Sequence, residues 1–130
     1  MNISGLNIHD NTFTSLGGAG RYQAIYINPD IGQGLATIED NEFGGAIRRA
    51  IATERSNVLI KENTLSTELG FGDSNQAIAI WNFYGIDVDD VEVIDNIIND
   101  FATGVQVNFQ GFGVGTNGIL INENTIVGNN

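Results

Sequence analysis

An eight-residue pattern recurs five times along the chain and constrains its fold more than any other feature. The pattern reads apolar, any, apolar, any, acidic, Asn, any, apolar. Its copies begin at Leu6, Ala36, Val58, Val91 and Ile119. The aligned asparagines, which are 30, 22, 33 and 28 residues apart, are Asn11, Asn41, Asn63, Asn96 and Asn124. Because the pattern is constant while the segments between its copies vary in length, it indicates structural units that stack on one another.

Four further segments between these copies also alternate apolar residues. They are Ala24–Ile27, Ala50–Thr53, Ala77–Ile80 and Gly104–Val107. The period of two predicts strands, and no segment has a helical period. One strand pair cannot bury its apolar side alone, whereas stacked copies share a core and pair along their backbones. The sequence therefore predicts an all-β fold, a parallel β-helix of about five short coils that spans residues 1–130 as a single domain.

The alternation also predicts which side chains face the interior. The repeated pattern contributes the columns Leu6, Ala36, Val58, Val91, Ile119 and Ile8, Ile38, Ile60, Val93, Ile121. The second kind of strand contributes Ile25, Ile51, Ile78, Val105 and Ile27, Thr53, Ile80, Val107. Thr53 is the polar exception, and we expect a weak point in the core there.

The repeated asparagine follows a strand, at a point where the chain must turn. Asparagine tolerates the left-handed backbone conformation better than most residues, so we expect each copy to adopt it. Its amide can also hydrogen-bond from coil to coil as a ladder. The asparagine column is therefore interpreted as structural and not as a row of catalytic residues.

The segment Asn57–Leu65, Asn-Val-Leu-Ile-Lys-Glu-Asn-Thr-Leu, resembles the parallel β-helix repeat of the pectate-lyase-like superfamily. That superfamily includes pectate lyases, polygalacturonases, alginate epimerases, and carbohydrate-binding and sugar-hydrolysing domains. The resemblance covers nearly the whole chain and implies a right-handed coil and an extracellular or cell-surface location. It implies no particular activity, because the motif encodes a turn and not a reaction.

Both ends of the predicted coil expose strand edges. Enzymes of the superfamily are usually longer and carry a capping helix, whereas the first copy here starts close to Met1 and the last reaches Ile126. Two explanations are open. The chain is an excerpt of a longer β-helix, or its ends pair with copies of itself or with another protein. The first residues lack the basic region and apolar block of a signal peptide.

The charge of the chain excludes several partners. Its 16 acidic and 5 basic residues give a net charge of −11. This charge repels phosphate backbones, anionic polysaccharides and anionic membranes, so nucleic acid is not an expected partner. The absence of cysteine excludes disulfides and thiolate metal sites, and no apolar run is long enough for membrane insertion. Neutral glycans and divalent cations remain open as ligands.

The loop from Trp81 to Asp90 is the strongest candidate for a binding site. Aligning the second kind of strand places Trp81 beside Asn108 and Asn82 beside Phe109. Exposed rings stack on sugar faces while amides hold the hydroxyl groups. The predicted carbohydrate-binding residues are Trp81, Asn82, Phe83, Tyr84, Asn108, Phe109 and Phe112. The alternative is that these rings only close the loop against the side of the coil.

The same loop contains the densest acidic cluster, Asp87, Asp89 and Asp90. Carboxylate oxygens are the ligands that Ca²⁺ prefers, so the cluster predicts a weak calcium site. The pattern matches neither an EF-hand loop nor the glycine-rich nonapeptide of calcium-binding β-rolls. A solvated acidic turn is therefore the alternative interpretation, and no other cofactor is predicted.

No complete catalytic set is present in the sequence. His9 and Asp10 have the residue types of a general-base dyad, but His9, the only histidine, is expected at an exposed outward position. The pair Arg48-Arg49 suits a uronate carboxylate, and Arg55 is nearby. The companion motifs of polygalacturonases and the Asp-Pro-His motif of alginate epimerases are absent.

Glu39 and Lys61 align outward on adjacent coils, where a cross-strand ion pair explains them without catalysis. The sequence therefore favours a non-catalytic extracellular module that binds carbohydrate or acts as a surface scaffold. One alternative is part of a polysaccharide lyase, epimerase or glycoside hydrolase of the superfamily. The other is a self-assembling β-solenoid that associates end to end through its open ends.

Overall fold

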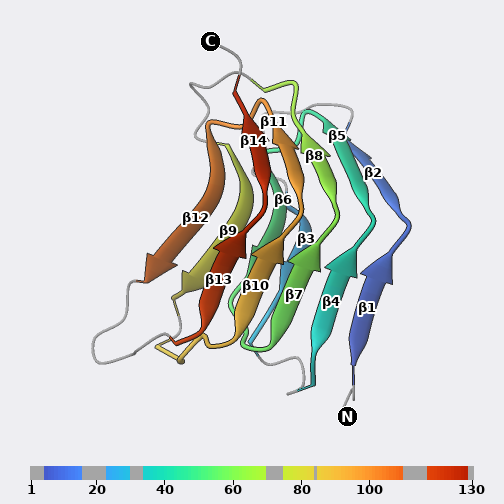
Figure 1. The fold of residues 1–130 in the computed structure, drawn as a ribbon. Coiled ribbons are helices and arrows are strands. Elements are labelled where there is room, and N and C mark those ends of the chain that lie inside the picture. The colour runs from blue at the N-terminus through green and yellow to red at the C-terminus, as the bar shows by residue number, and fades with distance from the viewer. Residues whose placement is uncertain are drawn as a thin grey trace.

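The computed structural model describes residues 5–15, 23–29, 34–69, 75–83, 85–109 and 117–128. Within these residues the chain forms strands and turns without a helix, and each strand pairs in parallel with the strand one coil away. Figure 1 shows the strands stacked along one axis, from the blue first coil to the red last coil, as the chain winds in a right-handed sense. The predicted all-β parallel β-helix of about five coils is confirmed.

Three parallel sheets form the sides of the coil. The first sheet contains β1 (Leu6–His9), β4 (Ala36–Glu39), β7 (Val58–Lys61), β10 (Val91–Ile94) and β13 (Ile119–Asn122). The second sheet contains β2 (Thr12–Ser15), β5 (Glu42–Gly45), β8 (Thr64–Ser66), β11 (Ile97–Asn99) and β14 (Thr125–Val127). The third sheet contains β3 (Gln23–Ile27), β6 (Arg49–Thr53), β9 (Gln76–Asn82) and β12 (Thr103–Phe109).

The register of the strands confirms the predicted interior columns. In the first sheet Ala36 pairs with Val58, and the columns continue in step from β1 to β13. In the third sheet Ile51 pairs with Ile78. Because the side-chain period of a strand is two, a slip of one residue would have turned these columns outward.

Each coil has one more bend than the sequence pattern indicated. The eight-residue pattern divides at its acidic residue and asparagine into a strand of the first sheet and a strand of the second. Its last apolar position therefore belongs to the second sheet, where Phe43 pairs with Leu65 and both are fully buried. The segments expected to form a second sheet form the third one, so three sheets enclose the core.

The left-handed conformation expected of the asparagines belongs instead to the acidic residue before each of them. The positive φ angles are 55° at Asp10, 52° at Asp40, 55° at Glu62, 54° at Asp95 and 56° at Glu123. The asparagine side chain turns inward, and in Asn63 its Nδ2 donates to the carbonyls of Ile38 and Lys61. Because the amide must reach these carbonyls inside the coil, the chain reverses one residue earlier.

The predicted asparagine ladder is confirmed. In four successive pairs, the backbone N–H and the Nδ2 of one asparagine both donate to the Oδ1 of the asparagine on the next coil, at distances of 2.9–3.1 Å. The ladder runs without interruption from Asn11 to Asn124. It satisfies polar groups that would otherwise be buried without partners at the bend between the first and second sheets.

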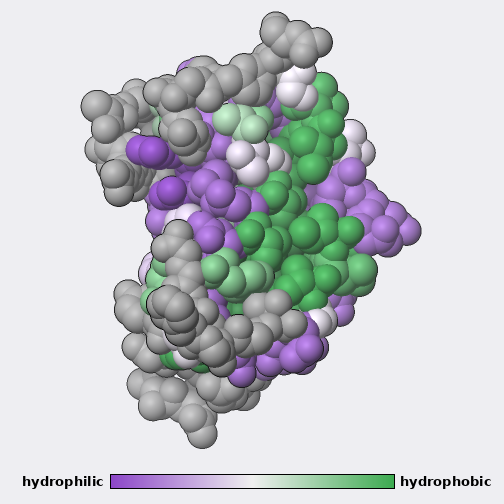
Figure 2. All heavy atoms as spheres, turned by 90° about the vertical axis from the view of Figure 1, so that its left-hand side faces the viewer, coloured by the Kyte–Doolittle hydropathy of each residue, from purple (hydrophilic) through white to green (hydrophobic). Residues whose placement is uncertain are grey.

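The apolar core follows the axis of the coil and is open at its C-terminal end. Ile38 and Ile60 are fully buried, whereas Ile121, in the same column, is 44% exposed. Ile126 in β14 is 54% exposed and Val107 in β12 is 40% exposed. Figure 2 faces this end of the coil and shows the hydrophobic atoms as one continuous patch.

Candidate functional site

The outer face of the third sheet carries a connected group of aromatic and polar side chains. Register places Tyr26, Ala52, Ala79 and Gln106 in one row across four coils. The two alanines are fully buried and form a cluster with Trp81, which is 6% exposed. Small side chains at the two central positions leave room for the indole ring to pack against the sheet.

A chain of hydrogen bonds crosses the same face from coil to coil. The Nε of Arg49 donates to the Oε1 of Gln76 at 2.6 Å, and the Nε2 of Gln76 donates to the Oε1 of Gln106 at 2.6 Å. The Nε1 of Trp81 donates to that Gln106 oxygen at 3.4 Å. The guanidinium carbon of Arg49 lies 4.6 Å from the centre of the Trp81 ring. These contacts hold amide and guanidinium groups in fixed positions on the face.

Two aromatic rings on this side of the molecule remain exposed. Phe83 is 45% exposed, and its ring centre lies 5.2 Å from that of Trp81 with a tilt of 49°. Tyr26 is 39% exposed, and its hydroxyl donates to the Oε1 of Glu54 at 2.9 Å. The face therefore combines exposed aromatic carbon with ordered polar groups.

The predicted carbohydrate-binding residues divide into four groups. The register predicted for Trp81 beside Asn108 and for Asn82 beside Phe109 is confirmed. Phe83 is exposed, Asn108 and Phe109 are half-buried, and Tyr84 and Phe112 lie outside the described residues.

The expectation that Trp81 is exposed is wrong, because the two alanines beneath it and Arg49 above it cover the ring. Asn82 is also buried, at 2% exposed, because it occupies an inward position at the end of β9.

Several residues of this face were not among the predicted site residues. They are Tyr26, Arg49, Glu54, Gln76 and Gln106. The sequence contained a signal for the row, since aligning the four third-sheet strands puts Tyr26 and Gln106 in register with two alanines. The hydrogen bonds among the long side chains had no such signal, because they depend on side-chain conformations.

Two residues of the acidic cluster predicted to hold calcium have structural roles, one in hydrogen bonds with neighbouring segments and one in a turn. An Oδ1 of Asp89 accepts from the backbone N–H of Asn117 at 2.7 Å, and the N–H of Asp89 donates to the Oγ of Ser56 at 2.9 Å. Asp90 has a positive φ of 55° and makes the turn before β10. In the described part of the chain, Asp87, Asp89 and Asp90 are not among the carboxylates that converge closely enough to share a metal ion. Calcium binding at this loop stays a prediction.

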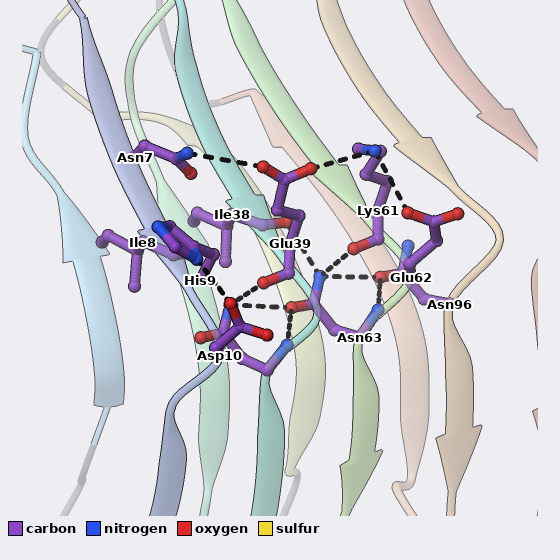
Figure 3. A network of polar contacts seen from close by, with 11 residues as sticks. Asn7, Ile8, His9, Asp10, Ile38, Glu39, Lys61, Glu62, Asn63 and Asn96 are labelled. Atoms are coloured by element: carbon purple, nitrogen blue, oxygen red, sulfur yellow. Dashed lines mark hydrogen bonds and ion pairs between the residues drawn. The ribbon is translucent and has the colours of Figure 1, made fainter.

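The carboxylates that do converge lie at the bend between the first and second sheets. Glu39, Asp40 and Glu62 each place an oxygen within 4.8 Å of the others. The Nζ of Lys61 lies 2.9 Å from Glu39 and 3.1 Å from Glu62. Figure 3 marks both contacts with dashed lines. The predicted pair of Glu39 and Lys61 is thus confirmed, and an ammonium group already contacts two of the three carboxylates.

The ammonium group also changes the acidity of its neighbours. The hydrogen bond from Lys61 lowers the pKa of Glu39, and the hydrogen bonds to Glu39 and Glu62 raise the pKa of Lys61. Beside this network lies a shallow groove of about 410 Å³. It is lined by Asp10, Asn11, Thr12, Asp40, Asn41, Glu42, Glu62 and Thr64. Its lining is strongly acidic, which disfavours anionic ligands.

His9 is exposed and lies beside this network, as expected. Its Nδ1 is 2.7 Å from the Oδ2 of Asp10. The hydrogen bond and the negative charge of Asp10 raise the pKa of His9 above its ordinary value of 6.5. When His9 is protonated, this contact is an exposed ion pair.

Comparison of the chain with protein-family models, with curated proteins and with solved structures found no match. None of the elements in the described part of the chain is a helix of the length and apolarity needed to cross a bilayer. The fold defines the chain as a parallel β-helix, and its function must be argued from the side chains on its surfaces.

Proposed function

We propose that the chain is a non-catalytic, extracellular β-helix module of the pectate-lyase-like type that binds neutral carbohydrate on the outer face of its third sheet. The exposed ring of Phe83 beside an ordered row of amides supports this proposal. Aromatic carbon packs on the C–H face of a sugar ring, and amides exchange hydrogen bonds with its hydroxyl groups. The repeat of the coil presents such groups at intervals along the axis, which suits an extended glycan.

The acidic and basic groups on the face favour binding over catalysis. Glu54 is buried and accepts a hydrogen bond from Tyr26. Glycoside hydrolysis by two carboxylates requires a second carboxyl group across the scissile bond, whereas Glu54 is paired with a phenol. Arg49 stacks on Trp81 and bonds Gln76, so its charge helps to position the face.

The test uses Trp81, the only tryptophan, as a built-in reporter. Its fluorescence is measured while cello-, manno- and xylo-oligosaccharides are added, with and without Ca²⁺, and oligogalacturonate serves as the charged comparison. We expect a saturable change with a neutral sugar. Calcium dependence would implicate the loop from Asp87 to Asp90.

Two variants locate the binding site. Phe83→Ala should weaken binding at least tenfold, since it removes the exposed ring. Leu120→Ala is the matched control, because Leu120 is 46% exposed on the first sheet and lies away from the face. The proposal fails if no sugar changes the fluorescence, or if Phe83→Ala binds as tightly as the unmodified protein.

A second candidate function, end-to-end assembly, is favoured by the open C-terminal end. Its exposed residues include Ile121 and Ile126, which continue the interior columns. The first coil of a second copy presents the same repeat, so the contact would reproduce the one formed between neighbouring coils inside the chain. In that contact the N–H and Nδ2 of Asn124 would donate to the Oδ1 of the copy's Asn11, as each inner asparagine does.

Light scattering from micromolar to millimolar protein tests the assembly. We expect the average mass to rise with concentration, and Ile121→Asp to abolish the rise because it puts a charge in the contact. Leu120→Asp, one residue away and outward, should leave the rise intact. A constant monomer mass over the whole range would exclude the assembly and leave the carbohydrate proposal untouched.

A further inference from the structure

Two buried polar residues follow a pair of aligned positions on adjacent coils of the third sheet. Thr53 pairs with Ile80, and Arg55 and Asn82 each lie two residues further along their coils. Arg55 is 5% exposed and Asn82 is 2% exposed. Asn82 ends β9 with the same inward alternation as Ile80, whereas Arg55 lies in the bend that follows β6.

The backbone holds Arg55 firmly in this place. The Oγ1 of Thr53 accepts the N–H of Arg55 at 3.2 Å, which satisfies the buried hydroxyl and fixes the turn after β6. The weak point expected at Thr53 is therefore a hydrogen-bonded turn. The Oε1 of Glu54 accepts from the hydroxyl of Tyr26 on the outer face, and its Oε2 is buried without a partner.

Several polar side-chain atoms of Arg55 and Asn82 lack protein partners. The Nε and Nη2 of Arg55 and both amide atoms of Asn82 are buried without a hydrogen bond. Among the described residues, Arg55 takes part in none of the ion pairs. Burial lowers the pKa of Arg55. A buried cation is normally paired, because leaving it unpaired costs several kcal/mol.

We propose that Arg55 and Asn82 form a binding site for the carboxylate group of a small ligand. The Nε and Nη2 of an arginine lie on one edge of the guanidinium and form a fork that matches the two oxygens of a carboxylate. The Nδ2 of Asn82 is a third donor. The net charge of −11 favours a ligand with a single negative charge over a dianion.

Thermal unfolding at constant ionic strength tests the site, with chloride replaced stepwise by formate or acetate and with sulfate and phosphate as comparison anions. We expect the melting temperature to rise saturably with formate or acetate, by about 5 °C at a tenfold excess over the dissociation constant. Glucuronate and glucose are compared next. A response to glucuronate at lower concentration than to acetate identifies a sugar acid, and equal responses identify a free small acid.

Two variants assign the effect to these residues. Arg55→Met should abolish the response, whereas Asn122→Asp, an exposed substitution with the same change in net charge, should preserve it. Asn82→Asp supplies a carboxylate within the protein, so it should melt higher than the unmodified protein without formate and gain nothing from adding it. The proposal is overturned if formate and acetate have no effect, if only sulfate or phosphate stabilises, or if Asn82→Asp responds as the unmodified protein does.

This inference does not depend on carbohydrate binding at the outer face. Phe83→Ala should leave the response to formate unchanged, and Arg55→Met should leave the fluorescence response to a neutral sugar in place. The two proposals therefore fail separately.

Discussion

Asn63 donates two hydrogen bonds to the same oxygen of Asn96, from its backbone N–H at 3.0 Å and from its Nδ2 at 2.9 Å. Its own Oδ1 accepts the corresponding pair from Asn41. Each of the three inner asparagines thus joins three coils, and its side chain replaces water for buried backbone groups. The coil depends on this column as much as on its apolar columns.

Removing one member of the ladder should be costly. Asn63→Ala leaves the carbonyls of Ile38 and Lys61 and the amides of Asn41 without their partner, so we expect a loss of about 3–5 kcal/mol in the free energy of unfolding. Urea denaturation measures the loss. Asn122→Ala, at an exposed position, should stay within about 0.5 kcal/mol. Equal effects of the two substitutions would show that the ladder contributes no stability of its own.

The register predicts opposite outcomes at two adjacent residues. Ile60→Asp should unfold the domain, because Ile60 is fully buried. Burying an unpaired carboxylate in the core costs more free energy than the unfolding free energy of a small domain. Leu59→Asp should be tolerated, since Leu59 faces outward and is only half-buried. Circular dichroism and size-exclusion chromatography distinguish the outcomes, and a folded Ile60→Asp variant would falsify the inside–outside assignment.

The left-handed acidic residues should tolerate glycine unusually well. Asp95 has a φ of 54° and an exposed side chain, and glycine adopts this conformation without the steric cost of about 1 kcal/mol. Asp95→Gly should therefore raise the free energy of unfolding or leave it unchanged. Glu92→Gly removes the same charge from the strand of the same coil and should lower it by about 1 kcal/mol. A loss of similar size in both variants would contradict the explanation.

The contact between His9 and Asp10 predicts a pH dependence. The pKa of His9 is raised in the folded state, so its protonated form stabilises the fold below the unfolded pKa of about 6.5, and this contribution disappears as the pH rises through the folded value. Titration of the single histidine by NMR should find a pKa above 6.5. Asp10→Asn should bring it back toward that value, while Glu92→Gln, on a distant coil, should not.

The candidate site was only partly predictable from the sequence. Phe83 and the register of Trp81 with Asn108 follow from aligning the strands, because the pairing of a strand is set by its alternation. The burial of Trp81 does not follow, since it depends on two alanines and an arginine from other coils. Arg55 and Asn82 look like ordinary polar residues until the fold buries both of them.

The sequence by itself determined the parallel coil, the interior columns and the asparagine ladder. A repeated alternation with one buried face favours in-register stacking of the copies, so local pattern and tertiary structure agree on these features. Only the tertiary structure decided that each coil has three sides, that the acidic residue and not the asparagine carries the positive φ at Asp40 and Glu62, and which polar groups are buried without partners. Those features depend on where amides and carbonyls from different coils meet in three dimensions, and no spacing along the chain records that.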